Sequence, residues 1–361
     1  MSFSFPHPCP HSGSCTVKPF FGRGVGMADV APSLGPEWRE WLAENVVRGV
    51  DAERLVDVLV SEGFPRATAR AEVDATREHP AVRAGLGHTR LHEDTLCLLD
   101  TRVSLHRHSG RHRRVERHKD LPIPEVMARY YLAHRPVLLE GFMRDWPLMK
   151  RWTPQSLARD LGDVEVEVMA GREARPDHDL EPDACRTVMR FAEFLRRLEE
   201  GGPSNDLYLT ARNFALEREE LRGLLDDVRY PPGLLRKSSR PGAVKLWVGP
   251  AGTLTGLHHD LGSVLFGQVS GRKRFRLIPS FQTHHVYSHL EVWSQVDAER
   301  PDLTRFPAYR EADVLEVIVE PGDMLLIPAG WWHWVHALEV SVSVTFQEFD
   351  VPEGNTWWKL G

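Results

Sequence analysis

The stretch "HHDLGSVLFGQVSGRKRF", residues 258–275, contains the residues that decide the fold. Side chains alternate across a β-strand, so His258 and Asp260 are expected on the same face. In the strand that follows, Lys273 shares a face with Phe275, while arginines occupy the opposite face. The arginine face is the expected solvent side. The pattern therefore predicts a β-structure whose apolar interior receives a lysine, close to a histidine–aspartate pair.

The histidine–aspartate pair suits a divalent metal ion. A second histidine from a distant strand would complete a 2-His-1-carboxylate triad, the arrangement of non-haem Fe(II) oxygenases. The segment "EPGDMLLIPAGWWHWVHAL" supplies His333 after an apolar strand and a Pro-Ala-Gly bend. His336 is the alternative, but it is expected on a different face. The sequence therefore predicts that His258, Asp260 and His333 bind the metal.

Lys273 is unusual because its ammonium group is expected inside the apolar core. A buried charge is costly unless an opposite charge meets it. No carboxylate nearby in the sequence is an obvious partner, so a small ligand that carries a carboxylate would satisfy this lysine. There are two alternatives: the aliphatic part of the Lys273 side chain extends far enough for the ammonium group to reach solvent, or the ammonium group pairs with a distant glutamate.

The whole chain has the composition of a folded protein. Of its 361 residues, 42% are hydrophobic and 27% are charged, and the formal net charge is −6. The absence of a basic excess argues against a nucleic-acid partner. No apolar run approaches the roughly 20 residues that a membrane span requires, and no secretory signal is present. The four cysteines are sparse and irregularly spaced, which predicts a reducing cytoplasm.

The chain is expected to fold as α+β, mainly β with helices. Residues 1–32 are predicted to form a disordered leader, and 34–84 a small bundle of three amphipathic helices. Residues 85–120 read as a basic, histidine-rich connector, in which the basic run 102–119 is expected to be a solvated loop or an edge strand. Residues 121–361 form a mixed domain. Beyond Gly242, short strands separated by glycine-containing turns predict an antiparallel sandwich or barrel.

Five motifs carry a resemblance to a known family: "PVLLEGFMRDWP", "LYLTARNF", "TGLHHD", "GQVSGRKRFRLIP" and "PGDMLLIPAGWWHWV". Over about residues 120–350 the chain resembles the JmjC/cupin-like, Fe(II)- and 2-oxoglutarate-dependent oxygenases. Within them it is similar to the protein-hydroxylase branch that includes the asparaginyl hydroxylase. The resemblance implies a double-stranded β-helix (jelly-roll) core, and it implies Fe(II), 2-oxoglutarate and O2.

The resemblance also implies roles for single residues. The three predicted ligands would bind Fe(II), and Lys273 would bind the distal carboxylate of 2-oxoglutarate. Thr255 would donate a hydrogen bond to that carboxylate, and Tyr208 would assist. The asparaginyl hydroxylase has asparagines at the place of Val264 and near Thr345. Because both amides are missing here, the asparaginyl substrate is not carried over.

Two further groups of residues are candidates for the substrate pocket. Ser343 and Thr345 share one face of the last strand. That face either lines the pocket or is exposed to solvent. Trp331 and Trp332 directly precede the third metal ligand, and Trp334 follows it. Packing in the barrel is the commoner fate of a tryptophan, and one of them is a candidate for the substrate wall.

The predicted reaction is hydroxylation of a side chain of a protein or peptide, with release of succinate and CO2. The alternatives are a small-molecule hydroxylase, an N-methyl-lysine demethylase and a non-catalytic cupin binding module. The intact triad argues against the binding module, and no reader module or zinc cluster typical of chromatin demethylases is found. No oligomeric state is predicted.

Overall fold

The computed structural model describes residues 34–175, 178–289, 292–352 and 355. The leader expected at 1–32 lies outside these residues. The chain divides into two compact units between Leu99 and Asp100.

The first unit contains three short helices where the apolar periodicity predicts them. These are α1 (Pro36–Val47), α2 (Ala52–Ser61) and α3 (Arg66–Glu78). The side chain of Asp51 accepts hydrogen bonds from two backbone N–H groups in the first turn of α2, which is the expected capping arrangement. The helices bury their apolar faces against one another around the fully buried Leu42, Leu55 and Leu59.

The first part of the connector expected at 85–120 is a helix, and the basic run 102–119 ends in an edge strand. Helix α4 (Pro80–His108) covers 29 residues, and only β1 (Glu116–Lys119) is an edge strand. The physical reason is local. Residues 88–109 contain neither glycine nor proline, so nothing interrupts the helix until Gly110, which adopts a left-handed φ of 71°. A run of basic side chains exposes charge, but it does not break a helix.

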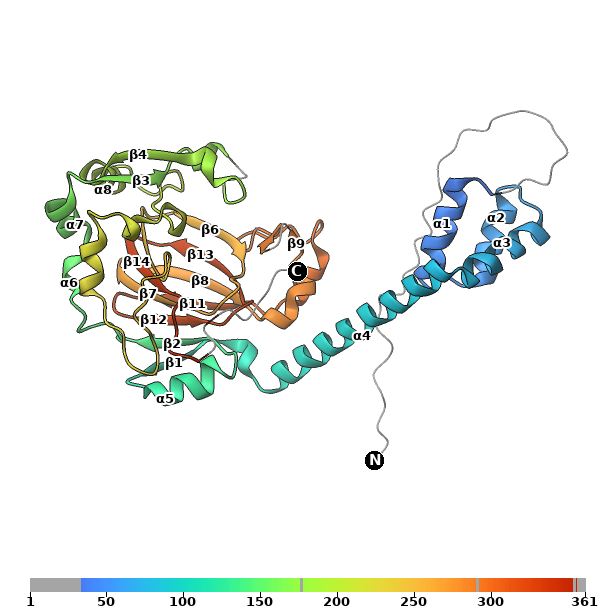
Figure 1. The fold of residues 1–361 in the computed structure, drawn as a ribbon, viewed down its shortest axis with the longest axis horizontal. Coiled ribbons are helices and arrows are strands. Elements are labelled where there is room, and N and C mark those ends of the chain that lie inside the picture. Colours follow the sequence, from blue (N-terminus) through green and yellow to red (C-terminus); the bar gives the residue numbers. More distant parts are fainter. Residues whose placement is uncertain (1–33, 176–177, 290–291, 353–354, 356–361) are drawn as a thin grey trace. The chain divides into compact units, whose positions relative to one another are not determined.

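The second unit is built on two facing sheets (Figure 1). Among the described residues, each of these sheets has six strands, in the orders β1-β2-β12-β7-β14-β5 and β11-β8-β13-β6-β10-β9. Pairing is antiparallel apart from β1 with β2. The remaining bounds are β2 (Val137–Glu140), β5 (Val244–Gly249), β6 (Leu254–His258), β7 (Val264–Ser270), β8 (Lys273–Ile278), β9 (Ser288–His289), β10 (Trp293–Ser294), β11 (Leu315–Val319), β12 (Met324–Ile327), β13 (Trp332–Ala337) and β14 (Ser341–Phe346). This is the antiparallel sandwich that the short strands predict, with the jelly-roll architecture that the family resemblance implies.

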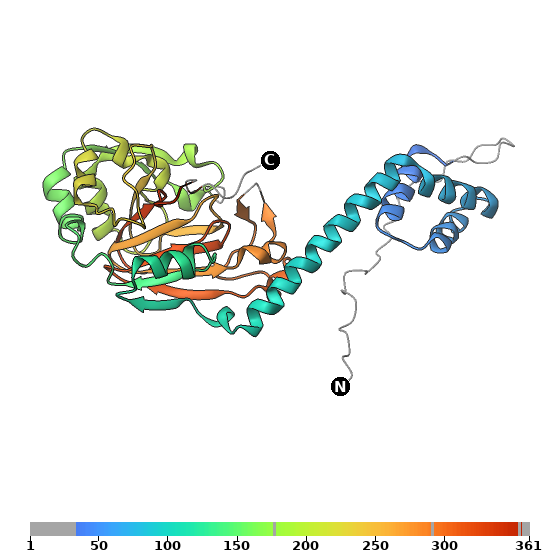
Figure 2. The ribbon, with the colours of Figure 1, turned by 60° about the horizontal axis from the view of Figure 1, so that its bottom comes forward.

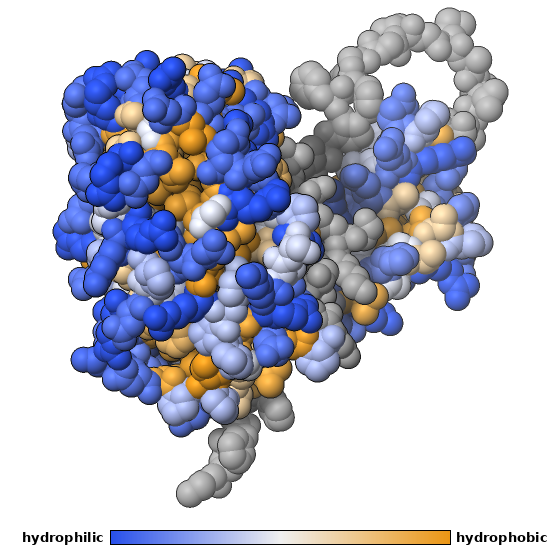
Figure 3. All heavy atoms as spheres, turned by 60° about the vertical axis from the view of Figure 1, so that its left-hand side comes forward, coloured by the Kyte–Doolittle hydropathy of each residue, from blue (hydrophilic) through white to orange (hydrophobic). Residues whose placement is uncertain are grey.

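Helices cover the outer face of the first sheet. They are α5 (Ile123–Val126), α6 (Leu148–Arg151), α7 (Pro154–Leu161) and α8 (Phe191–Glu200), and a small sheet of β3 (Glu165–Met169) and β4 (Arg186–Arg190) lies beside them (Figure 2). Buried residues such as Phe194, Leu246 and Val344 form the core of this layer. On the face drawn in Figure 3, hydrophilic side chains surround a smaller group of hydrophobic ones.

A second apolar cluster lies between the two sheets and includes Phe266, Phe275 and Leu325. It fills one part of the sandwich, and the rest of the interior is left for the site described below. No helix in the described part of the chain is both long enough and apolar enough to cross a membrane.

Candidate active site

The three predicted metal ligands come together inside the sandwich. His258 ends β6, Asp260 follows two residues later, and His333 lies on β13, which pairs with β6. One ligand atom from each side chain lies within 4.8 Å of the other two. Nε2 of His333 is 3.6 Å from Oδ2 of Asp260, and the two imidazole rings are 4.1 Å apart between centroids. The arrangement is therefore compact enough for one metal ion.

Backbone hydrogen bonds orient both imidazoles. Nδ1 of His258 lies 2.8 Å from the carbonyl oxygen of Gly256, and Nδ1 of His333 lies 3.0 Å from that of Trp331. In a neutral imidazole, donation by Nδ1–H to such a carbonyl leaves Nε2 free to bind a metal. Burial lowers the pKa of His333 to about 3, so this ring is neutral. Two imidazole nitrogens and a carboxylate are the ligand set that fits a divalent ion such as Fe(II).

His336, the alternative ligand, lies on the other face of β13. Its Nδ1 is 3.2 Å from Nη2 of Arg274, on the arginine face of the neighbouring strand β8. Strand alternation explains the difference, because residues three apart point to opposite sides. The prediction that His333 rather than His336 accompanies the other two ligands agrees with this geometry.

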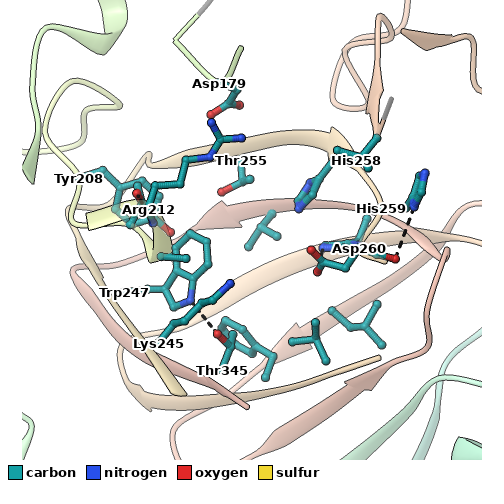
Figure 4. Close-up of a pocket in the computed structure, with 18 of the residues that line it drawn as sticks. Asp179, Tyr208, Arg212, Lys245, Trp247, Thr255, His258, His259, Asp260 and Thr345 are labelled. Atoms are coloured by element: carbon teal, nitrogen blue, oxygen red, sulfur yellow. Dashed lines mark hydrogen bonds and ion pairs between the residues drawn. The ribbon is translucent and has the colours of Figure 1, made fainter. Parts of the chain in front are cut away.

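A β-bulge brings Thr255 to the same face as His258. In the pairing of β6 with β13, His258 lies opposite His333 and Thr255 lies opposite Val335. Three steps along β6 thus match two steps along β13, so β6 carries one extra residue. Regular alternation would turn Thr255 away from His258, whereas the bulge lets both side chains line the same cavity (Figure 4).

Lys273 is buried as predicted, with a relative exposure of 1%. Its Nζ donates a hydrogen bond of 3.1 Å to the hydroxyl oxygen of Tyr208, which is also buried. Among the described residues no carboxylate forms an ion pair with this ammonium group. One neutral oxygen is a weak partner for a buried charge, so the site is suited to an anionic ligand.

Both residues line a cavity of about 360 Å³ together with the three metal ligands. Val264 and Thr345, the positions that carry no asparagine, also line it. Trp247 Nε1 donates a hydrogen bond of 3.1 Å to Thr345 Oγ1 (Figure 4). Ser343 is fully buried and donates instead to Oε1 of Gln268, at 2.9 Å, outside the lining of the cavity.

The structure places Trp331 and Trp332 outside the lining of this cavity. Trp331 packs between the sheets, and its Nε1 donates to the carbonyl oxygen of His134 at 3.3 Å. Trp332 packs on the outer side of the second sheet, against His259. Because Trp332 is adjacent to His333 on one strand, alternation turns it away from the metal ligands. The candidate substrate wall is therefore not formed by this pair.

Other aromatic and basic side chains line the cavity instead. The ring of Trp293 stacks on His258 with centroids 4.8 Å apart, and the guanidinium of Arg212 lies 5.8 Å from the centroid of Trp293. Lys245 and Trp247 reach the cavity from β5. Sequence reasoning missed these residues. Alternation in "VKLWVG" could have found the two on β5, since their neighbours Leu246 and Val248 belong to the opposite, apolar face.

Arg172 also lines the cavity, but its charge is already engaged by an ion pair of 3.5 Å with Asp179. Its guanidinium donates to Asn205 Oδ1 at 2.7 Å and to the carbonyl oxygen of Leu254 at 2.9 Å. Arg172 and Arg212 lie outside the regular strands, where alternation gives no signal.

A second histidine–aspartate cluster, formed by Asp100, His284 and His285, also brings its ligand atoms within 4.8 Å of one another. None of the three lines the cavity, and Nε2 of His284 is already 3.1 Å from Oδ1 of Asp100. The triad, by contrast, opens on a cavity with a buried, weakly partnered lysine. It is therefore the stronger candidate for a catalytic metal centre.

A jelly-roll sandwich with a 2-His-1-carboxylate set in its interior defines a cupin-type metal site. Comparison with known proteins agrees, because residues 124–350 match the family described as the cupin-like domain. The chain therefore belongs to the cupin-like domain family. Its relatives place it in the JmjC group of that family, whose oxygenases use Fe(II), 2-oxoglutarate and O2.

Several relatives have names that refer to different reactions. Lysine-specific demethylase JMJ30 of Arabidopsis thaliana is 32% identical over 253 residues, which is 68% of this chain and 55% of that protein. The bifunctional peptidase and (3S)-lysyl hydroxylase JMJD7 of Homo sapiens is 26% identical over 60% of this chain and 79% of its own length. tRNA wybutosine-synthesizing protein 5 of Danio rerio is 30% identical over 59% of this chain and 68% of its own length. This chain spans about half the length of JMJ30.

Proposed function

We propose that this protein is an Fe(II)- and 2-oxoglutarate-dependent dioxygenase that hydroxylates a side chain of a protein or peptide and releases succinate and CO2. One observation supports the proposal: the three candidate metal ligands line the same cavity as Lys273, a buried lysine with a weak partner. A metal site alone would fit many cupins. A lysine that needs a carboxylate is explained by a cosubstrate that has one.

His258, Asp260 and His333 would hold Fe(II). When bound, Fe(II) and 2-oxoglutarate supply the activation of O2 that hydroxylation requires. The protein contributes positioning: the backbone acceptors at Gly256 and Trp331 hold the two imidazoles with Nε2 toward the metal position.

Lys273 would bind the distal carboxylate of 2-oxoglutarate. Tyr208, whose hydroxyl is 3.1 Å from the lysine Nζ, orients the ammonium group and can share the carboxylate with it. Thr255 adds a hydroxyl to the lining of the same cavity. The apolar walls at Val264 and Phe275 exclude water, which strengthens a charge-assisted hydrogen bond inside the cavity.

Succinate formation tests the proposal. Purified protein is incubated with 2-oxoglutarate, Fe(II), ascorbate and air, without an added substrate. We expect slow uncoupled turnover in the wild type and none in His258→Ala. In Lys273→Ala, turnover should return only at high 2-oxoglutarate concentration, because the cosubstrate has lost its anionic contact.

His333→Ala and His336→Ala form a matched pair for the third ligand, since they remove the same side chain from opposite faces of β13. Only His333→Ala should abolish turnover. No turnover in the wild type, combined with no 2-oxoglutarate binding by anaerobic calorimetry with Mn(II), would reject an oxygenase and favour the non-catalytic binding module.

Demethylation of N-methyl-lysine is the second candidate reaction, because relatives such as JMJ30 carry that name. A small-molecule hydroxylase is the third. Mass spectrometry separates the reactions on a peptide substrate: hydroxylation adds about 16 Da, whereas demethylation removes about 14 Da and releases formaldehyde.

We also propose that the protein acts in the cytoplasm, a reducing compartment, on the basis of its sparse and irregular cysteines. Cell fractionation with an antibody against the chain tests this, and recovery in a nuclear or secreted fraction would contradict it.

A further inference from the structure

Lys245 is a cation in the active-site cavity that neither the metal ligands nor the 2-oxoglutarate contact requires. It lies on β5, and alternation points it inward, next to Trp247 and opposite Thr345 (Figure 4). The lysine is half-buried, and among the described residues its ammonium group has neither an ion pair nor a hydrogen bond. Its partner is therefore to be sought in a ligand.

The charges around Lys245 do not neutralise it. Asp260 is the carboxylate that attracts it, but Asp260 is one of the three metal ligands. Arg212 and Arg240 repel it. Burial and these arginines hold the pKa of Lys245 below its usual range, against the attraction of Asp260.

The cavity as a whole has more positive than negative groups. The described lining contains four cationic side chains, Arg172, Arg212, Lys245 and Lys273, and two carboxylates, Asp179 and Asp260. A divalent metal and the dianion 2-oxoglutarate would cancel each other when both are bound. The surplus of positive charge thus remains for the primary substrate.

We propose that the protein or peptide substrate carries an acidic side chain at the reacting position or next to it, and that Lys245 binds its carboxylate. This inference rests on the proposed function above. Arg212, placed over Trp293 and therefore close to His258, extends the cationic wall. A trimethylated or free lysine would meet like charge in this cavity, with the cost of burying it unrelieved.

Arg172 and Lys273 do not provide the same contact. Arg172 is engaged by Asn205 and by the backbone of Leu254, and Lys273 is engaged by Tyr208 at the place expected for 2-oxoglutarate. Two cations of the described lining therefore remain, Lys245 and Arg212. Arg212 is exposed and Lys245 is half-buried, so Lys245 is the one placed to select a substrate inside the cavity.

Three peptide pools test the proposal. The pools have degenerate flanks and differ at the central position: Asp and Glu, their isosteres Asn and Gln, or Lys, Arg and trimethyl-lysine. The readouts are succinate formation above the peptide-free rate and a mass increase of about 16 Da in the peptide. The acidic pool should stimulate the wild type about tenfold or more beyond the amide pool, as expected for loss of a charged hydrogen bond.

Two variants at Lys245 sharpen the test. Lys245→Met should remove the preference for the acidic pool, and Lys245→Glu should shift the preference to the basic pool. Lys237→Met, which removes an exposed lysine outside the cavity, is the matched control and should behave as wild type. An acidic preference that survives both Lys245 variants overturns the proposal.

Wild-type preference for the amide or basic pool also overturns it. Uncoupled turnover without stimulation by any pool rejects an acidic peptide as substrate while leaving the oxygenase assignment intact. Absence of all turnover and of 2-oxoglutarate binding rejects the proposed function itself, so the two failures are distinguishable.

Discussion

Replacement of Lys273 by methionine should stabilise the ligand-free protein and weaken its binding of 2-oxoglutarate. The side chain is 1% exposed, and its ammonium has a single hydrogen bond, to a neutral phenol oxygen. Methionine has a similar volume and no charge. Exchange of poorly compensated buried charges for apolar groups of similar size stabilises proteins by about 1–4 kcal/mol in favourable cases. In a domain of this size that corresponds to a rise of about 2 °C or more in Tm.

The same change should weaken 2-oxoglutarate binding. A charged hydrogen bond in a water-poor cavity is lost, and the carboxylate is left without its cation. The expected cost is about 2–4 kcal/mol, which is about 30- to 1,000-fold in Kd. Calorimetry with anaerobic Mn(II) gives the affinity, and thermal unfolding without metal or 2-oxoglutarate gives the stability.

In Lys273→Met the Tm of the ligand-free protein must rise while the affinity for 2-oxoglutarate falls. Lys237→Met, the exposed control, should change neither. A Lys273→Met protein with wild-type affinity for 2-oxoglutarate would show that the lysine does not hold the cosubstrate. A lower Tm in the ligand-free state would show that the buried ammonium is better satisfied than its single hydrogen bond indicates.

Two other residues give further predictions. A Cβ added at Gly249 would lie 2.8 Å from Cδ2 of Tyr208 and 2.8 Å from Oγ1 of Thr253, so Gly249→Ala should displace the tyrosine and raise the KM for 2-oxoglutarate about tenfold; an unchanged KM would contradict a role for Tyr208 in cosubstrate binding. Burial lowers the pKa of His285 from 6.5 to about 4, so the unfolded chain binds a proton at this residue more tightly than the folded chain does. The stability that comes from keeping His285 neutral is complete above pH 6.5 and should be lost as the pH falls toward 4. Urea unfolding of His285→Asn between pH 4.5 and 7 should therefore show a shallower dependence on pH than the wild type, and equal slopes would refute it.

Much of the candidate site could be predicted because a β-strand has a strict period of two. Alternation paired His258 with Asp260, turned Lys273 inward and separated His333 from His336. The same rule, applied consistently, also turns Trp332 away from His333 and brings Lys245 into the cavity. The helix α4 was not predicted for a different reason: the basic run 102–119 indicated a loop or an edge strand, although residues 88–109 contain neither glycine nor proline.

The residues that alternation cannot reach are those set by irregular pairing or by loops. Thr255 joins His258 only because β6 carries a bulge opposite β13, and a bulge depends on two strands that are far apart in the sequence. Trp293 comes from a strand of two residues, and Arg212 from a 3₁₀ turn. Neither short segment has a periodicity of its own.

The sequence by itself thus determined the strands, the parity of their side chains and the chemistry of the metal ligands, because these follow from local alternation and the cost of burying charge. Only the tertiary structure decided which side chains share the cavity: it set the strand register, introduced the bulge and brought loop residues over His258. Those contacts join residues with no local relation in the sequence, so the cationic wall that is proposed to select the substrate became visible only in the folded chain.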